Sequence, residues 1–285
     1  MVDVSILIPA YNEAENIAAC LEKVQSVCDS LNEETEIIVI DDGSNDGTPE
    51  TAGASGVRVI SHSHNRGYGA ALKTGLKHSA GDAIVILDAD LTYPAERIPE
   101  LLERLKGTSM AVGARTGDSV HIPTIRRPAK WVLGRLANLV AGQKIPDLNS
   151  GLRAFRKDLA LKYMHLYPDG FSFTTTLTLA ALCDGHEVAF IPIDYAARGG
   201  RSKVRPIKDT LNFLILIIRV AAYFEPLRVF LPATLFSGCI SLLLIGYYMF
   251  KDGGLSDACV FACLITFLIF MMGILADLVV RRARQ

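Results

Sequence analysis

Several features that mark other classes of protein are missing from this 285-residue sequence. Its formal net charge is −1, so no overall excess of basic residues indicates a nucleic-acid-binding protein, and we expect no nucleic acid among its partners. The six cysteines form no CxxC pair, which favours reduced packing residues. No basic segment precedes the short apolar run at the N-terminus, so we expect no signal peptide. No internal repeat or linker interrupts the first 205 residues.

Charged residues are also missing from two long stretches near the C-terminus. Residues 229–250 carry no charge over 22 positions, and residues 258–276 carry none over another 19. Each stretch is long enough to cross a bilayer core of about 30 Å. The polar segment KDGGLSD separates them. We therefore predict a membrane hairpin in residues 227–285, with spans at about 229–250 and 258–280; a hairpin buried in a soluble core is the alternative.

The charges around this hairpin predict its orientation. Basic residues lie at its outer ends, at Arg219, Arg228, Arg281, Arg282 and Arg284. The turn between the spans offers only Lys251 against two aspartates. By the positive-inside rule, we expect an integral protein of the inner or plasma membrane with both termini and the N-terminal domain in the cytoplasm. Residues 206–226 predict an amphipathic helix at the membrane surface, and a helix packed on the globular domain is the alternative.

Residues 1–205 predict a single α/β domain. Four apolar runs, VSILIPAY, EIIVIDDGS, VRVISHS and AIVILDAD, are typical of buried strands. Helical patterns lie between them, at about residues 13–31 and 67–79. Strands that are apolar throughout and alternate with helices indicate a mostly parallel sheet covered on both faces. Such sheets bind ligands at the carboxyl ends of their strands.

Acidic residues follow two of these strands. Asp41 and Asp42 end one strand, and Asp88 and Asp90 end another. Residues i and i+2 of an extended chain point to the same side, so Asp88 and Asp90 face one spot. Two carboxylates with open positions suit Mg²⁺ or Mn²⁺ that also binds a substrate's phosphate oxygens. A pair of solvated loop residues is the simpler interpretation of a DxD sequence taken alone.

Six motifs in fixed order give a specific resemblance. They are IPAYNEAENI (8–17), IDDGSNDGT (40–48), NRGYGAALKTGL (65–76), LDADL (87–91), DLNSGLRAFRKD (147–158) and RGGRSK (198–203). Together they resemble an inverting family 2 glycosyltransferase of the dolichyl-phosphate mannose synthase branch. The resemblance covers about residues 4–230, and the two-span tail is similar to that of members that load a sugar onto a polyprenyl phosphate. It implies the Rossmann-like GT-A fold.

The resemblance also implies roles for residues that would bind the donor. It assigns nucleotide-sugar binding to Pro9, Tyr11, Glu13, Asp42, Asp88 and Ala89, metal binding to Asp88 and Asp90, and catalysis to Asp90, Arg115, Arg198 and Lys203. Many relatives have Gln two positions after the second acid, where this chain has Thr92. A side-chain metal ligand at that position is therefore not expected.

The acceptor phosphate would be bound by basic and small residues. The resemblance assigns this role to Arg126, Arg127, Ser150, Arg153, Arg198, Ser202 and Lys203. The sequence ARGGRSKVR supports it, because Arg and Lys donate charge-assisted bonds and glycines let backbone N–H groups approach an anion. A basic patch attracted to anionic lipid is the alternative. We expect His62 and His64 to lie on the surface, and the TTT run at 174–176 departs from the acidic residue of many relatives.

These observations predict metal-dependent, inverting transfer of a hexose from a nucleotide-sugar, of the GDP-mannose or UDP-glucose type, to dolichyl or undecaprenyl phosphate. A polyprenyl phosphate is already an anion, so its oxygen needs little help from a general base. The partners are then the donor, the lipid acceptor and the bilayer, and a homo-oligomer is compatible with the sequence. A membrane family 2 enzyme that extends a polysaccharide or glycolipid is the alternative. In an inactive scaffold we would expect loss of Asp88 or Asp90, yet both are present.

Overall fold

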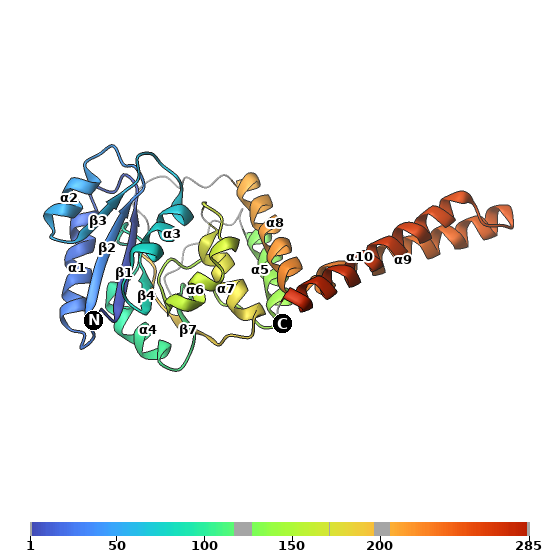
Figure 1. Cartoon of the computed structure of the whole chain (residues 1–285). Coiled ribbons are helices and arrows are strands. Elements are labelled where there is room, and N and C mark those ends of the chain that lie inside the picture. The colour runs from blue at the N-terminus through green and yellow to red at the C-terminus, as the bar shows by residue number, and fades with distance from the viewer. Residues whose placement is uncertain (1, 117–126, 171, 197–205, 284–285) are drawn as a thin grey trace. The chain divides into compact units, whose positions relative to one another are not determined.

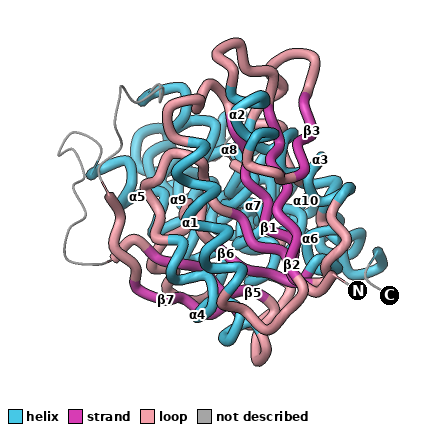
Figure 2. The backbone as a smooth tube through the Cα atoms, turned by 90° about the vertical axis from the view of Figure 1, so that its left-hand side faces the viewer, coloured by secondary structure: helices cyan, strands magenta, loops and turns pink. Residues whose placement is uncertain are grey.

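The computed structural model describes residues 2–116, 127–170, 172–196 and 206–283. By its internal contacts the chain divides into two compact units, Met1–Phe213 and Leu214–Gln285. The first unit contains a seven-stranded sheet (Figures 1 and 2). Its strands are β1 (Val4–Ala10), β2 (Thr35–Asp41), β3 (Arg58–Ser61), β4 (Ala83–Ile86), β5 (Met110–Ala114), β6 (Arg153–Arg156) and β7 (Val188–Pro192).

The strands follow the order β3-β2-β1-β4-β6-β5-β7 across the sheet. All neighbouring pairs are parallel except those of β6, which runs antiparallel to both β4 and β5. The predicted mostly parallel α/β sheet is confirmed. The four predicted strands correspond to β1, β2, β3 and β4, whose carboxyl ends therefore point the same way.

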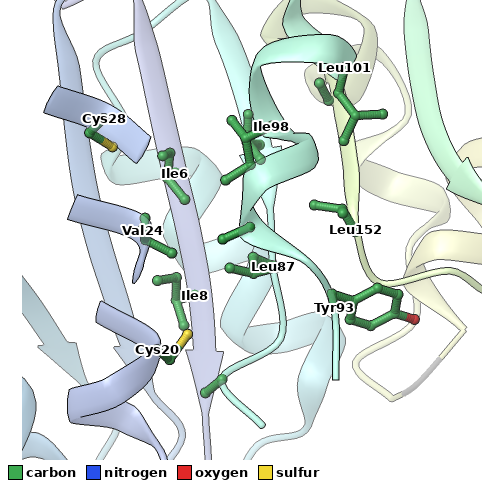
Figure 3. Close-up of a cluster of buried hydrophobic side chains, with 14 of the residues drawn as sticks. Ile6, Ile8, Cys20, Val24, Cys28, Leu87, Tyr93, Ile98, Leu101 and Leu152 are labelled. Atoms are coloured by element: carbon green, nitrogen blue, oxygen red, sulfur yellow. The ribbon is translucent and has the colours of Figure 1, made fainter. Parts of the chain in front are cut away.

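Helices cover both faces of this sheet. The helices of the first unit are α1 (Ile17–Asp29), α2 (Thr48–Ala54), α3 (Tyr68–His78), α4 (Ile98–Leu105), α5 (Arg127–Ala141), α6 (Lys157–Lys162) and α7 (Phe173–Cys183), with 3-10 turns η1 (Ala95–Arg97) and η3 (Met164–Leu166). On one face, α1 and α4 contribute Val24 and Ile98 to the cluster that contains Ile6 and Ile8 (Figure 3). On the other face, α3 packs on β1 and β2 and contacts α6 and α7.

Strand β1 shows why this sheet is apolar throughout. All seven of its residues are buried. Ile6 and Ile8 belong to the cluster with α1 and α4, whereas Leu7 lies against Gly75 of α3 on the opposite face. Because successive side chains alternate between faces, a strand covered on both sides needs apolar residues at nearly every position. The core thereby holds the strand ends, and the loops that follow them, in fixed places.

The second unit is dominated by two long apolar helices, α9 (Pro226–Asp252) and α10 (Asp257–Ala283). They pack on each other, and Gly253, whose φ of +67° is left-handed, caps the C-terminus of α9. Residues Pro226–Lys251 and Asp257–Arg282 are each long and apolar enough to cross a membrane. These ranges contain the two predicted spans. Upstream, α8 (Pro206–Phe224) occupies the segment for which a surface helix was predicted; its position at a membrane stays a prediction, as does a domain boundary at residue 205.

Candidate active site

Loops at the carboxyl ends of β1 and β2 are bound to each other. Asn12, in the left-handed region at φ +55°, accepts a bond from the backbone N–H of Asn45 at 3.0 Å. Its own N–H donates to Ser44 Oγ at 2.9 Å, and Glu13 N–H donates to Thr48 Oγ1 at 2.9 Å. These cross-links hold the loop that contains the predicted donor-binding residues Tyr11 and Glu13, both half-buried; Pro9 is buried within β1.

Asp88 lies just beyond β4 and is half-buried. Its Oδ1 accepts a bond from the hydroxyl of Tyr68 at 3.0 Å. Its Oδ2 lies against Gly151, where a Cβ would approach it to 2.4 Å. Gly151 N–H in turn donates to Tyr93 Oη at 2.7 Å. The carboxylate is therefore held between α3 and the segment that leads into β6.

Asp90 is also half-buried, while Ala89 between the two acids is 2% exposed. Asp90 Oδ1 accepts bonds from the hydroxyl of Thr92 at 2.5 Å and from its backbone N–H at 3.2 Å. Burial and the two nearby carboxylates, Asp90 before Asp88, raise the pKa of the Cys20 thiol to about 12. Both carboxylates thus lie near the thiol of Cys20 in α1.

Asp42 has a different environment from that of Asp88. Its side chain is 5% exposed. Its carboxylate accepts bonds from the backbone N–H groups of Arg66 at 2.9 Å and Gly67 at 2.8 Å. These bonds fix the segment that leads into α3. Direct contact of Asp42 with a nucleoside stays a prediction.

His62 is a third partner of the Asp42 carboxylate, because its Nδ1 lies 2.7 Å from Asp42 Oδ1. Its Nε2 lies 2.9 Å from Thr74 Oγ1, and the side chain is 5% exposed. The prediction that His62 lies on the surface is therefore wrong. The reason is tertiary: α3 covers the ring after β3. His64, two positions later, is exposed as predicted.

Arg115 follows β5 and forms a bidentate ion pair with Asp147. Its Nε donates to Oδ2 at 2.7 Å and its Nη2 to Oδ1 at 2.9 Å. The guanidinium also lies 5.2 Å from the centre of the Tyr195 ring. Burial opposes the charge of Arg115, but the bonds to Asp147 keep the pKa of Arg115 above its usual range. Burial likewise favours the neutral form of Asp147, but the bonds from Arg115 hold the pKa of Asp147 below its usual range. The predicted catalytic role of Arg115 stays a prediction; in the structure its guanidinium is bound to Asp147.

Ser150 and Arg153, both predicted to line the acceptor pocket, are completely buried. The Ser150 hydroxyl donates to the carbonyl of Gly113. The Arg153 guanidinium donates to the Ser150 carbonyl, to Thr174 O at 2.9 Å and to Thr178 Oγ1 at 2.8 Å. Burial lowers the pKa of Arg153 to about 10. These contacts support a role in positioning the 150–153 segment, and direct acceptor binding by either residue stays an untested prediction.

The threonine run that departs from the resemblance lies in α7. Thr174, Thr175 and Thr176 are all buried. The Thr175 hydroxyl donates to Asn149 Oδ1, and the Thr176 hydroxyl donates to Ser172 O at 2.9 Å. The hydroxyls of Thr175 and Thr176 thus form hydrogen bonds within the protein.

The predicted acceptor residues Arg126, Arg198, Ser202 and Lys203 lie outside the described residues, and the side chain of Arg127, the first residue of α5, is not described. Their predicted roles are therefore untested. Tyr68, Tyr93 and Asp147 were not among the residues predicted from the sequence. Tyr68 lies within the quoted motif NRGYGAALKTGL, but no local pattern indicates that its hydroxyl reaches Asp88.

The donor set at the end of β4 fits a divalent cation of the Mg²⁺ type. Asp88 and Asp90 supply carboxylate oxygens, and the absence of a side chain at Gly151 gives the first of them room. Within the described parts of the chain, no group of three or more His, Cys, Asp or Glu side chains could hold a metal. A cation here would take its remaining ligands from a substrate diphosphate and water, as Mg²⁺ commonly does.

Fold and site together define the class: a GT-A-type transferase, with paired acids after the central strand of a mostly parallel sheet. The chain belongs to glycosyl transferase family 2, whose sequence model matches residues 5–164. Residues 225–281 match a second family, the GtrB C-terminal hairpin. The two units therefore correspond to two sequence families.

A curated relative is the undecaprenyl-phosphate 4-deoxy-4-formamido-L-arabinose transferase of Edwardsiella ictaluri. It is 32% identical over 207 residues, which cover 70% of this chain and 62% of the relative. The matched region thus spans less than two thirds of the relative's length.

Solved structures of glucosyl-3-phosphoglycerate synthase from Mycobacterium tuberculosis share the fold. The complex with UDP has a TM-score of 0.59 at 21% identity, covering 77% of this chain and 80% of that chain. The complex with Mn²⁺, UDP-glucose and phosphoglyceric acid has a TM-score of 0.60 at 21% identity and the same coverage. At such low identity the likeness concerns the fold alone.

Proposed function

We propose that this protein is an inverting hexosyltransferase that moves a sugar from a nucleotide-sugar to a polyprenyl phosphate. One observation carries the proposal: a single chain joins a family 2 sheet, with Asp88 and Asp90 after β4, to an apolar hairpin of the GtrB type. The name of the Edwardsiella ictaluri relative, which specifies undecaprenyl phosphate, supports the lipid acceptor.

The donor would bind where the loops after β1, β2 and β4 meet. The cross-linked loops at Asn12 and Asn45 support a fixed nucleoside site beside Tyr11 and Glu13. Asp88 and Asp90 would hold Mg²⁺ or Mn²⁺, which when bound neutralises charge on the donor's diphosphate. GDP-mannose and UDP-glucose are both donors of the proposed type.

The acceptor chemistry requires no strong general base. A polyprenyl phosphate is an anion near neutral pH, so its oxygen can attack the anomeric carbon directly. The attack forms a bond from that oxygen to the anomeric carbon while the bond to the nucleoside diphosphate breaks on the opposite side, which inverts the configuration. The carboxylate of Asp147 is consistent with this scheme, because it is bound to Arg115 in a structural ion pair and is not needed as a general base. The protein's main tasks are then to position two anions and exclude water.

The acceptor phosphate would be held by Arg198, Ser202 and Lys203, together with Arg126 or Arg127. Replacing Arg198 or Lys203 by Ala removes one charge-assisted bond, so we expect a tenfold to hundredfold loss in turnover or acceptor affinity, from about 1.5–3 kcal/mol. The assay should use detergent and a short water-soluble polyprenyl phosphate, because no anionic bilayer is then present. Wild-type kinetics in both variants would show that residues 198–203 do not bind the acceptor phosphate and form only a basic patch attracted to anionic lipid.

The same proposal places both termini and the sheet unit in the cytoplasm. The positive-inside rule supports this orientation through the arginines at the outer ends of the hairpin. A cysteine reporter placed after Gln285 should be labelled only from the cytoplasmic side, and one at Gly253 only from the far side. Labelling of the C-terminal reporter from outside would contradict the orientation.

A donor panel tests the reaction itself. Purified protein is incubated with undecaprenyl or dolichyl phosphate, Mg²⁺ or Mn²⁺, and one of several GDP- and UDP-sugars. We expect one donor to give a lipid product heavier by one hexose unit in the mass spectrum, and Asp90→Asn to give none. Transfer to an oligosaccharide but not to lipid phosphate would overturn the proposal.

A further inference from the structure

The two acids after β4 pose a mechanical problem. Asp88 and Asp90 carry like charges two positions apart, and each carboxylate can rotate about its own side-chain bonds. Without other contacts, repulsion would favour rotamers that separate the charges. A cation site that is ready for its ligand needs both carboxylates held by their surroundings.

A hydroxyl from another helix holds Asp88. The Tyr68 hydroxyl donates to Oδ1 at 3.0 Å, across 20 positions in sequence. The opposite oxygen, Oδ2, lies against Gly151, where a side chain would clash. Contacts on both sides therefore restrict rotation of this carboxylate.

The first turn of α3, which carries Tyr68, is itself held from two sides. On one side, Arg66 and Gly67 donate their backbone N–H groups to Asp42. On the other, Gly69 N–H donates to Gly170 O and Ala70 N–H to Asp169 O, both at 3.1 Å.

Glycines permit these close approaches. Gly67 has a φ of +101°, and a Cβ on it would lie 2.5 Å from Asp169 O. A Cβ on Gly69 would lie 2.1 Å from Pro168 O. The glycines around Tyr68 thus let two loops fix its backbone, which gives the phenol a defined position.

A hydroxyl also holds Asp90. Thr92 donates both its hydroxyl, at 2.5 Å, and its backbone N–H, at 3.2 Å, to Oδ1. Leu91 between them has a φ of +59°, a left-handed conformation that a leucine adopts at a cost. Thr92 is 2% exposed, so its hydroxyl bonds to Asp90 and not to solvent. The strained turn is therefore coupled to the orientation of Asp90.

We propose that Tyr68 and Thr92 are positioning residues, whose hydroxyls hold the carboxylates of Asp88 and Asp90 in the orientation that a divalent cation requires. The inference rests on the proposed function only in assuming that these two acids bind the metal. Residues that orient metal ligands commonly change metal affinity by tenfold to a hundredfold when removed. Neither residue is expected to touch the cation.

The test compares metal affinity in variants that lose only a hydroxyl. Full-length protein in detergent is titrated with Mn²⁺ alone, and free Mn²⁺ is measured by electron paramagnetic resonance. We expect Tyr68→Phe and Thr92→Val each to raise the Mn²⁺ dissociation constant about tenfold. Thr92→Ser keeps the hydroxyl and should restore wild-type affinity, which a merely structural role for the methyl group does not predict.

A matched control is Tyr167→Phe, which removes another buried hydroxyl, one that donates to Ala160 O at 2.9 Å. It should leave Mn²⁺ affinity unchanged even if it lowers the melting temperature. Unchanged affinity in both Tyr68→Phe and Thr92→Val, with Mn²⁺ binding lost in Asp90→Asn, would overturn the positioning role alone. Wild-type Mn²⁺ binding that survives in both Asp88→Asn and Asp90→Asn would instead overturn the proposed metal site.

Discussion

In the sheet unit, Ile6 of β1 is completely buried by helices of the same chain, whereas Phe250 of α9 in the hairpin is 96% exposed. Most other large apolar side chains of α9 and α10 are also exposed. Only 6% of the apolar stretch within Pro226–Lys251 and 11% of that within Asp257–Arg282 are buried. The sheet unit thus supplies its own apolar environment. The hairpin requires one from outside, which a bilayer would provide.

Polar contacts differ between the units in the same way. In the sheet unit, buried bonds link distant segments, as between Arg153 and α7 or Tyr68 and Asp88. In the hairpin, Ser237 and Ser241 share bonds with Thr266 at 2.8 and 3.1 Å. The first set joins different elements of the sheet unit, and the second joins two helices. We therefore expect the loss of a buried bond to cost more stability in the sheet unit than in the hairpin.

The largest expected effect separates activity from folding in the sheet unit. Asp90→Asn removes one of two neighbouring charges, so repulsion falls while the metal loses a ligand. We expect transfer to fall more than a hundredfold, by about 3 kcal/mol or more in transition-state stabilisation. The melting temperature in detergent should stay the same or rise. Full transfer by this variant in the presence of chelator would contradict the metal site.

A large effect on stability is expected from Arg153→Met. The change removes the guanidinium that donates to Ser150 O and removes one of the donors to Thr174 O, and we expect a loss of about 3 kcal/mol in the free energy of unfolding. For a unit of this size that corresponds to a melting temperature lower by about 6–12 °C. Arg156→Met in the same strand is the control, because Arg156 is exposed. Equal melting temperatures for the two variants would show that the buried bonds contribute little.

Gly151→Ala tests how tightly Asp88 is held. Its Cβ would lie 2.4 Å from Asp88 Oδ2, so either the carboxylate or the backbone must move. We expect a stability loss of about 1–3 kcal/mol, typical of overpacking, together with reduced transfer. Gly107→Ala introduces the same methyl group with nothing within 4 Å and should behave as wild type. Wild-type transfer by Gly151→Ala would show that Asp88 has freedom to move.

The smallest effects come from matched Thr→Val changes in the two units. Thr178→Val removes an acceptor of the buried Arg153 guanidinium, so we expect a loss of about 1–3 kcal/mol. Thr266→Val removes the hydroxyl shared by Ser237 and Ser241, and bonds between membrane helices average about 0.6 kcal/mol. Thermal unfolding in detergent should rank them in that order. The reverse order would mean that hydroxyl bonds hold the hairpin more strongly than the sheet unit.

The sequence by itself determined the class of fold and the place of the site. Apolar runs such as residues 83–87 predicted buried parallel strands, because burial on both faces demands apolar residues at successive positions. The acids at 88 and 90 followed such a run, and their spacing predicted that both carboxylates face one side. The two uncharged stretches near the C-terminus predicted helices that α9 and α10 confirm. All of these properties depend on near neighbours in the chain.

Tertiary structure decided what each of these groups touches. Burial of His62 under α3 and the contact of Tyr68 with Asp88 join residues from different elements. The antiparallel strand β6 brings Gly151 against Asp88 and places Arg153 in the interior. A local sequence pattern does not predict such contacts, because they depend on which segments pack together after folding. The sequence therefore indicated where the acids lie, and packing set how their carboxylates are held.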